Sequence, residues 1–367
     1  MDVVRCCTNS IQCQAPSYSL RDADNAYDKT LAPLGATTGQ MLALTQEILR
    51  QLTASHSPST SPTSSRKITQ MANLPPGTTV VRKSQYQHYI PRFLLEHFAP
   101  EYSGEGEEVG PPGSKYLVHS RDDILDAVFL APDTPSLIKS AVKKTFGQDD
   151  MYEQKSLLSA DQWNSVEKKL GKVETAAGML FKMIRAAHIE GSQNVVLDDG
   201  EYVTIMKFVF IIKYRSTLFF DRYNHQLSED YTGNDKAELV AYMHPNELDR
   251  LVDVWLNTIA QVVDLEMVSD KQWHVTLAQS IHPEHAAWAE LVMRRMYPVI
   301  CTSNEQGQEF VLSEHAYALQ EGPNMPGGGW IEFHIVCVIV PQIALLLRSD
   351  LLPDGIADTV DNVRIRR

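Results

Sequence analysis

The segment that most restricts the fold runs from Tyr202 to Tyr223 (YVTIMKFVFIIKYRSTLFFDRY) and is apolar on nearly all sides. Because such a helix is stable only when other elements surround it, the segment predicts a helix through the middle of an α-rich core. Three cations interrupt it, namely Lys207, Lys213 and Arg215. A buried cation needs an anionic partner, and the acidic residues within 149–153 are the expected partners. Alternatively, these long side chains extend along the helix to reach water.

Three carboxylates crowd together in the sequence Asp149-Asp150-Met-Tyr-Glu153. If this segment is helical, Asp149 and Glu153 are separated by one turn, and Asp150 faces the same side. Like charges held this close repel one another, so a cation should compensate them, or one acid should hold a proton and act as a general acid or base. The alternative is a solvated acidic first turn, which the helix dipole favours.

Hydrophobic spacing predicts further helices and a change of class near the C-terminus. Ser159 and Gln162 suit a capping box before a long helix whose apolar positions are Trp163, Val166, Leu170, Val173, Ala177, Leu180 and Ile184. Two more helices are expected to begin at Pro245 and Pro283. Strands are predicted at 298–302, 309–312, 331–340 and 343–348. The predicted fold class is therefore α+β, predominantly α-helical with a small C-terminal β-sheet.

Composition divides the chain into an extension and one folded domain. Residues 1–80 include a Ser/Thr/Pro run at 55–65, which predicts a mostly disordered extension. Within it, residues 38–52 have the spacing of an amphipathic helix. The folded, catalytic domain is expected at 81–350, followed by a C-terminal tail at 351–367.

Charge and cysteine content limit the classes of function. The formal net charge of -13 argues against broad binding to nucleic acid or to an anionic membrane. From Lys139 to His188, however, nine basic residues outnumber six acidic ones. This region is either a face for phosphates or a solvated helix surface. The five cysteines lack metal-type spacing, and neither a signal peptide nor a membrane span is indicated, so we expect a cytoplasmic protein.

Two other groups of polar residues are candidates for a site. His88 and Arg92 flank Pro91, which suits the first turn of a helix. Each is either a structural hydrogen-bonding or ion-pairing residue or a direct participant in the chemistry. Downstream, a hydroxyl, an acid and an imidazole are consecutive in Ser313-Glu314-His315. Neighbouring strand residues face opposite ways, so these groups would have to work with distant partners.

Three blocks carry a family resemblance: QHYIPRFLLEHFA at 87–99, FIIKYR at 210–215 and FVLSEHAY at 310–317. Together they resemble a widespread domain family of uncharacterised function that opens with HYxPRxxLxxF. A branch of it from filamentous fungi consists of arginine-containing cyclodipeptide synthases described by an essential D-D-x-x-E motif. This chain carries that motif at 149–153.

The resemblance implies a transferase that takes arginine from arginyl-tRNA and a second amino acid from its own aminoacyl-tRNA, and then closes a diketopiperazine. No ATP, metal or other cofactor is expected, because the aminoacyl ester is already activated. Asp149, Asp150 and Glu153 would hold the arginine guanidinium and deprotonate the attacking amine. Lys213 and Arg215 would meet tRNA phosphates or neutralise the acids, and His88 would shuttle a proton.

Bacterial cyclodipeptide synthases differ, since they are Rossmann-like and use a serine nucleophile that has no counterpart here. Two other classes of function remain open. A Mg²⁺-dependent terpene synthase would also use D-D-x-x-E, but its second metal motif has only a poor match at Asn234, Asp235 and Glu238. A non-enzymatic binding module would tolerate alanine at all three acids.

Overall fold

The computed structural model describes residues 84–100, 108–109, 116–119, 122–129, 136–153, 164–192, 194–225, 227–303, 308–323, 330–349 and 363–366, together with Gly106. The predicted extension at 1–80, with its helix at 38–52, lies outside these residues. The chain divides into two compact units. Of the described residues, the first unit holds 85–320, 332–349 and 363–366, and the second holds residues 84, 321–323 and 330–331. The site described below belongs to the first unit.

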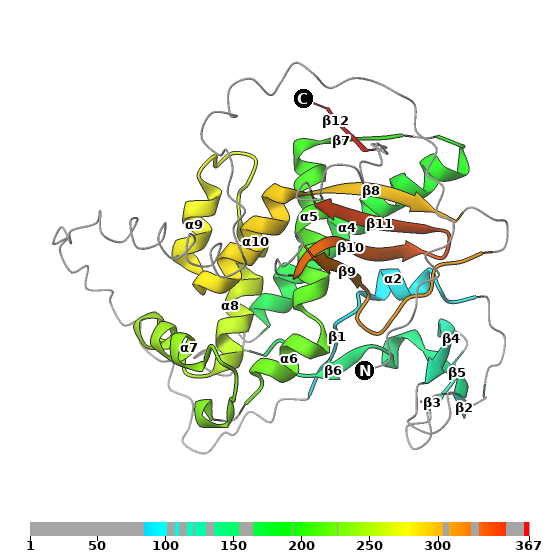
Figure 1. The fold of residues 1–367 in the computed structure, drawn as a ribbon. Helices are drawn as coiled ribbons and strands as arrows, with labels where there is room; N and C mark the ends of the chain where they lie inside the picture. The colour runs from blue at the N-terminus through cyan, green and yellow to red at the C-terminus, as the bar shows by residue number, and fades with distance from the viewer. Residues whose placement is uncertain are drawn as a thin grey trace, which may run out of the picture. The chain divides into compact units, whose positions relative to one another are not determined.

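Three long helices pack on one another at the centre of the first unit (Figure 1). They are α4 (Ser165–Ile189), α5 (Asp199–Tyr214) and α8 (Leu251–Asp264). Shorter helices surround them: α2 (Arg92–Glu96), α6 (Thr217–Tyr223), α7 (Lys236–Met243), α9 (Trp273–Ser280) and α10 (Pro283–Arg295). With the small sheets, this arrangement confirms the predicted α+β class, mainly helical.

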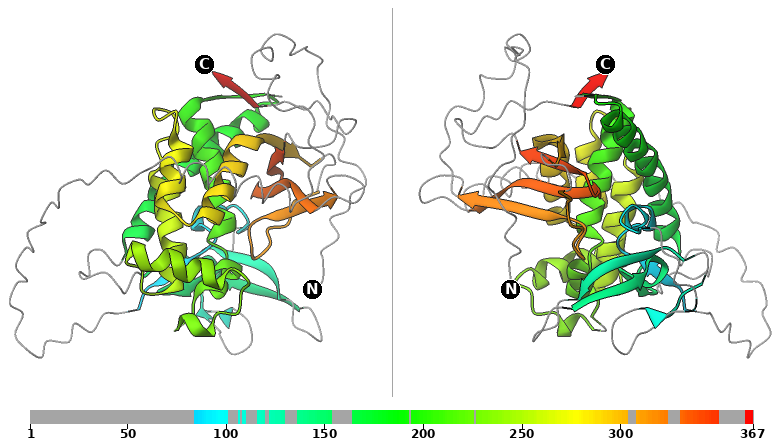
Figure 2. Two further views of the ribbon diagram at one scale, coloured as in Figure 1. Left: turned by 60° about the vertical axis from the view of Figure 1, so that its left-hand side comes forward. Right: turned by 90° about the vertical axis from the view of Figure 1, so that its right-hand side faces the viewer.

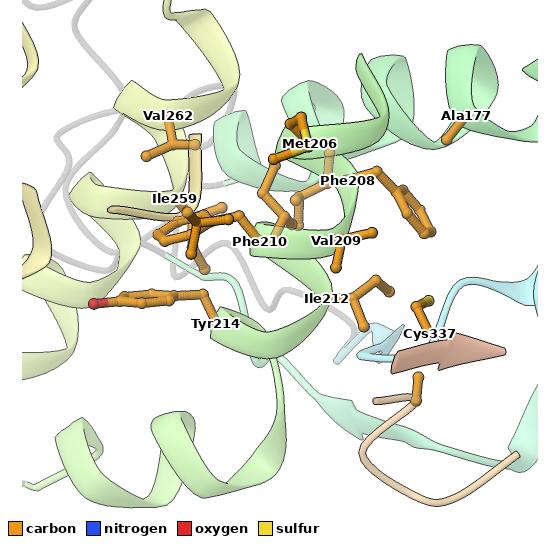
Figure 3. Close-up of a cluster of buried hydrophobic side chains, with 14 of the residues drawn as sticks. Ala177, Met206, Phe208, Val209, Phe210, Ile212, Tyr214, Ile259, Val262 and Cys337 are labelled. Atoms are coloured by element: carbon orange, nitrogen blue, oxygen red, sulfur yellow. The ribbon is translucent and has the colours of Figure 1, made fainter. Parts of the chain in front are cut away.

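Helix α5 is the buried helix that the apolar segment predicts. Its start is fixed by a capping box, in which the Glu201 N–H donates to Asp198 Oδ1 (2.7 Å) and the Asp198 N–H donates to Glu201 Oε2 (2.8 Å). Its side chains pack in several directions, toward α4, α8 and the sheet (Figure 3). Continuous burial from Phe208 to Tyr214 explains why no polar face was found in this segment.

The single helix predicted over 202–223 is wrong in one respect, because the chain breaks at Arg215 and Ser216. Ser216 has an extended backbone (φ −66°, ψ 159°), so α5 ends before it and α6 begins after it. Helix α8 also begins later than the predicted Pro245, which lies in a short 3₁₀ turn. Glu247 is left-handed (φ 53°), and helical backbone resumes only at Leu251. Helix α10 does begin at Pro283, as predicted.

The C-terminal sheet covers one side of the helices (Figure 2). Its strands are β8 (Met296–Thr302), β11 (Ile343–Ser349), β10 (Trp330–Val340) and β9 (Ala318–Pro323), in that order. The strand expected at 309–312 is wrong, because this segment has no ladder partner among the described residues, although Phe310 N–H donates to Pro341 O (2.6 Å). Cys337 on β10 faces Ile212 of α5 (Figure 3).

Four pairs of strands complete the described structure. Three are antiparallel: β1 (Tyr86–His88) with β6 (Gly147–Asp149), β2 (Glu108–Val109) with β3 (Tyr116–Leu117), and β4 (Ile124–Phe129) with β5 (Ser136–Ala141). The fourth is parallel and joins β7 (Val195–Asp198) to β12 (Val363–Arg366), so the segment expected to be a tail contributes a strand. Among the described helices, none is long and apolar enough to cross a membrane.

Candidate functional site

The acidic motif lies on a strand and a turn, so the prediction that its three carboxylates share a helix face is wrong. Asp149 ends β6, and Asp150 adopts the left-handed conformation (φ 55°), which aspartate tolerates better than most residues. Asp150 is tied to Gln85 twice, because its N–H donates to Gln85 O and its Oδ1 accepts from Gln85 N–H, both at 2.9 Å. Asp149 is exposed, whereas Glu153 is buried.

Contacts with β1 hold this turn in place. A Cβ on Gly147 would lie 2.5 Å from the Tyr86 ring and 2.7 Å from Gln87 O, so the two strands approach closely only because residue 147 is glycine. The buried Gln87 then uses both ends of its amide, accepting from Tyr152 N–H (2.6 Å) and donating to Glu167 Oε2 (2.8 Å). The motif is thereby connected to helix α4.

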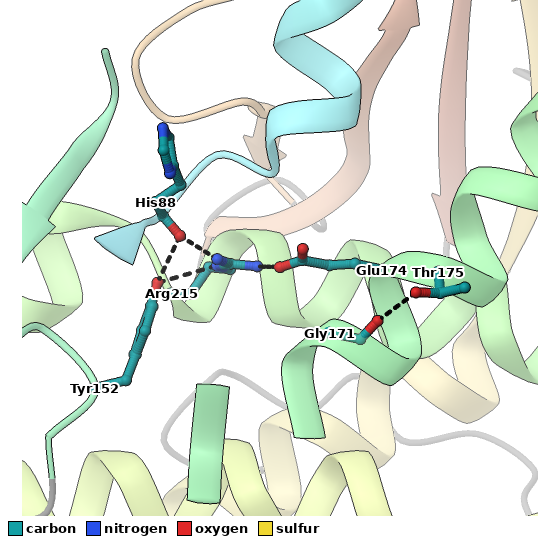
Figure 4. A network of polar contacts seen from close by, with 6 residues as sticks. All are labelled: His88, Tyr152, Gly171, Glu174, Thr175 and Arg215. Atoms are coloured by element: carbon teal, nitrogen blue, oxygen red, sulfur yellow. Dashed lines mark hydrogen bonds and ion pairs between the residues drawn. The ribbon is translucent and has the colours of Figure 1, made fainter. Parts of the chain in front are cut away.

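A buried arginine lies beside the turn (Figure 4). Arg215 is 3% exposed, and its Nε donates to the Tyr152 hydroxyl at 3.0 Å. Its two terminal nitrogens donate to Glu174 and to the His88 carbonyl. Glu174 is therefore the anionic partner of Arg215, and the expectation that the acidic motif would fill this role is wrong. A buried ion pair of this kind fixes the side chains that surround it.

These residues form one end of a groove of about 700 Å³ between α2 and α4. Its lining combines a buried cation, carboxylates, basic groups and a floor of small residues. Those lining residues are His88, Arg92, Phe93, Glu96, His97, Tyr152, Glu167, Leu170, Gly171, Glu174, Thr175, Gly178, Met179, Lys182 and Arg215. Within the described residues, Tyr152 is thus the member of the D-D-x-x-E segment that reaches the groove, next in the chain to the buried Glu153.

The protonation states at this end of the groove follow from burial. Burial raises the pKa of Tyr152 to about 12, although the nearby Arg215 opposes that shift, so the phenol is neutral at pH 7. Burial also lowers the pKa of His88, which favours the neutral imidazole. Since a carbonyl can only accept, His88 Nε2–H donates to Val142 O (3.0 Å) and leaves Nδ1 as the basic nitrogen. The neutral phenol and the Arg–Glu pair therefore face the His88 carbonyl, while the neutral imidazole of His88 is turned toward Val142 (Figure 4).

Comparison with known proteins gives one match. Residues 86–366 fit the model of a family described as protein of unknown function (DUF4238). The chain belongs to this family. No curated protein and no solved structure matches it. The DUF4238 match begins at the first residue of β1 and ends at the last residue of β12, so it includes the acidic turn, the buried arginine and the groove.

The other candidates from the sequence lie at different places in this DUF4238 domain. Arg92 lines the groove and pairs with Glu96 at 3.5 Å on its exposed side. Lys213 is buried with its Nζ 3.8 Å from the centre of the Trp288 ring, and it is not part of the groove lining. Ser313, Glu314 and His315 lie in a turn, outside the lining: the serine hydroxyl contacts Tyr317 O at 3.5 Å, and the acid and imidazole are 3.7 Å apart. The structure therefore brings only His88, Arg92 and Arg215 together at the groove.

Sequence analysis missed the two α4 carboxylates, although a signal for them was present. Glu167 and Glu174 alternate with the core residues Leu170 and Ala177 at spacings of three and four. That spacing puts both acids on the inward side of α4 rather than on its solvated face. No group of three or more His, Cys, Asp or Glu side chains with the geometry of a metal site occurs in the described parts of this DUF4238 domain.

Proposed function

We propose that this protein is a tRNA-dependent cyclodipeptide synthase that joins arginine from arginyl-tRNA to a second aminoacyl group and closes a diketopiperazine. The observation that carries the proposal is the D-D-x-x-E turn, locked against β1 and leading directly into Tyr152 in the wall of a groove with a buried arginine. Membership of the DUF4238 family agrees with the resemblance from which the activity was expected. The proposed setting is the cytoplasm, where charged tRNA is available.

The chemistry asks little of the protein beyond placement and proton transfer. An aminoacyl ester is already activated, so the site must hold two acyl groups together, remove a proton from the attacking amine and stabilise an oxyanion. The groove offers a fixed cation at Arg215 and a neutral phenol at Tyr152, whose hydroxyl accepts from Arg215 Nε (3.0 Å) and donates to His88 O (3.4 Å). It also offers a neutral imidazole at His88 for proton transfer.

In this proposal, the acids of the motif act on the arginine substrate. Asp149, Asp150 and Glu153 divide two tasks between them, a bidentate contact with the guanidinium and deprotonation of the amine. Asp150 accepts a backbone hydrogen bond from Gln85 N–H through Oδ1, which fixes the position of its carboxylate in the turn. Glu174 is paired with Arg215, so the negative charge that favours a cationic side chain in the groove comes from Glu167, which accepts from the neutral Gln87.

The test is mass spectrometry of extracts from a heterologous host that expresses the parent chain or one variant. The parent should produce a new arginine-containing diketopiperazine, whose mass also identifies the second amino acid. Asp149→Ala and Glu153→Ala should lower product at least 100-fold, which is the usual scale for loss of an acid–base group. The matched control is Asp249→Ala, which removes an exposed aspartate outside the groove and should leave product unchanged.

Absence of product from soluble parent protein would refute the proposal. Mg²⁺-dependent turnover of prenyl diphosphates would then be assayed for the terpene synthase class. In that class a second metal motif is required, but Asp235 is committed to Arg222 (2.6 Å) and to the Tyr231 hydroxyl (2.6 Å). An unchanged yield of product in both alanine variants would show that the D-D-x-x-E acids take no part in the reaction.

A further inference from the structure

The groove changes sign along helix α4. Glu167 and Glu174 line its first half, near the buried arginine, whereas Lys182 lines its far end. At a rise of 1.5 Å per residue, Lys182 lies about 12 Å along the helix from Glu174. Met179 lies between them and is 63% exposed, so an apolar surface separates the acidic end from the basic end.

Arg185 and His97 accompany Lys182 at the far end. Arg185 is exposed and follows Lys182 by three residues, which puts both side chains on the same face of α4. His97, from the end of α2, lines the groove there, and its pKa is lowered by burial and then by the charges of Arg185 and Lys182. All three groups are therefore close together, and no carboxylate contributes to the shift at His97.

The two strong cations at this end are uncompensated. Across the part of the chain that the structure describes, neither Lys182 nor Arg185 has an ion-pair or hydrogen-bond partner. By contrast, Lys169 on the opposite side of α4 pairs with Asp264 at 2.5 Å. Unpaired cations at the mouth of a groove are notable in a chain with a net charge of -13, because acidic partners are plentiful elsewhere.

We propose that Lys182, Arg185 and His97 form a phosphate-binding end of the groove, which holds the single-stranded 3′ end of a tRNA. The inference rests on the proposed function. The aminoacyl ester at the tip of that strand lies at the Glu174 and Arg215 end, and the phosphates that precede it in the strand meet the cations about 12 Å away. Met179 supplies an apolar contact for the intervening base. The sequence had offered Lys213 and Arg215 for phosphates, but Lys213 is buried and Arg215 is paired with Glu174.

The test measures the salt dependence of RNA binding with the full chain. The probe is a fluorescently labelled arginine tRNA that carries no amino acid. Its binding is followed by fluorescence anisotropy at salt concentrations from about 0.05 to about 0.3 M. Each single-strand phosphate contact contributes about 0.7 to the slope of log K against log salt. The double variant Lys182→Ala/Arg185→Ala should therefore lower the slope by about 1.4. If parent and variant bind equally at about 1 M salt, this difference in slope makes the variant bind roughly 25-fold more weakly than the parent at about 0.1 M salt.

Two controls make the result specific. The double variant Lys236→Ala/Lys271→Ala removes the same charge away from the groove and should leave the slope unchanged. A tRNA that lacks its single-stranded 3′ end should bind the parent with the same slope that the full tRNA shows with the Lys182/Arg185 double variant. Lys182 and Arg185 are both exposed, so the midpoint of thermal unfolding of their double variant should match that of the parent.

An unchanged slope in the Lys182/Arg185 double variant, or equal slopes for full and truncated tRNA, would overturn the inference. Equal loss in both double variants would also overturn it, because binding would then reflect net charge alone. The result is separable from the synthase proposal. If the parent chain binds tRNA with the expected slopes but yields no diketopiperazine, the phosphate-binding surface is supported and the synthase proposal is refuted. If product forms but the slope is the same in the Lys182/Arg185 double variant, the synthase proposal is supported and the phosphate-binding surface is refuted.

Discussion

Replacing Glu174 with glutamine tests whether the Arg215 network stabilises the domain. The change keeps the size of the side chain and one oxygen acceptor, and it removes the negative charge opposite Arg215. That arginine is 3% exposed, so it cannot exchange Glu174 for water. Its two other contacts, the Tyr152 hydroxyl and the His88 carbonyl, are neutral. The variant therefore leaves a buried cation without its anionic partner.

The expected loss of unfolding free energy depends on how deeply each of the two side chains, Arg215 and Glu174, is buried. Removing one member of a fully buried ion pair costs about 3–5 kcal/mol. The Glu174 side chain is 25% exposed, and glutamine still accepts a hydrogen bond, so we expect about 2 kcal/mol here. With a urea m-value of about 3 kcal/mol/M for a domain of this size, the unfolding midpoint should fall by about 0.7 M.

The assay is urea unfolding followed by circular dichroism, with a matched substitution as the control. Glu290→Gln removes the same charge from a Glu–Arg pair, 2.7 Å to Arg294, on an exposed helix surface. A surface pair of this kind contributes less than about 0.5 kcal/mol, so its midpoint should shift by less than about 0.2 M. Equal midpoints for the two variants would refute the claim that burial makes the Arg215 pair important.

Two further predictions concern the core and the acidic turn. Burial lowers the pKa of His285, which lies between the hydroxyls of Tyr223 and Thr258, to about 3. His285 binds a proton near pH 6.5 in the unfolded chain but stays neutral in the folded chain, so the free energy of unfolding should fall by about 2 kcal/mol from pH 6.5 to pH 5. In urea titrations at several pH values, His285→Gln should remove this pH dependence. Gly147→Ala should destabilise the domain by about 1–3 kcal/mol, since its Cβ meets a backbone carbonyl, whereas Gly171→Ala, with nothing within 4 Å, should stabilise α4 by about 0.5–1 kcal/mol in calorimetry.

Features of the fold that depend on local periodicity could be predicted from the sequence. The apolar run at 202–223 correctly identified a buried helix, and the spacing from Val166 to Ile184 identified the buried face of α4. Pro283 correctly marked the start of α10. Errors arose where backbone conformation changes abruptly. The break at Ser216 and the left-handed Glu247 have no periodic signal, because each depends on the conformation of a single residue.

The site was harder to predict because its contacts join distant parts of the chain. Tyr152 was part of the acidic segment, yet its contact with Arg215 spans 63 residues and depends on how β1 pairs with β6. The three acids were expected to converge if the motif were helical, because Glu153 follows Asp149 by four residues and Asp150 by three. Gly147 contradicted that assumption, since glycine before the acids favours close strand approach over helix. His88, Arg92 and Arg215, which the sequence offers as possible supporting residues, line the groove, and their role in binding or catalysis stays a prediction.

The parallel pair of β7 and β12 has a consequence for synthesis of the chain in the cell. Strand β7 precedes the central helix α5, but β12 is the last of the described elements to leave the ribosome. Until then, β7 is an open strand edge, with backbone groups able to pair with another chain. Domains fold as they are synthesised, so the helices can pack before this edge is closed. Nascent chains halted before residue 363 should therefore depend most on chaperones.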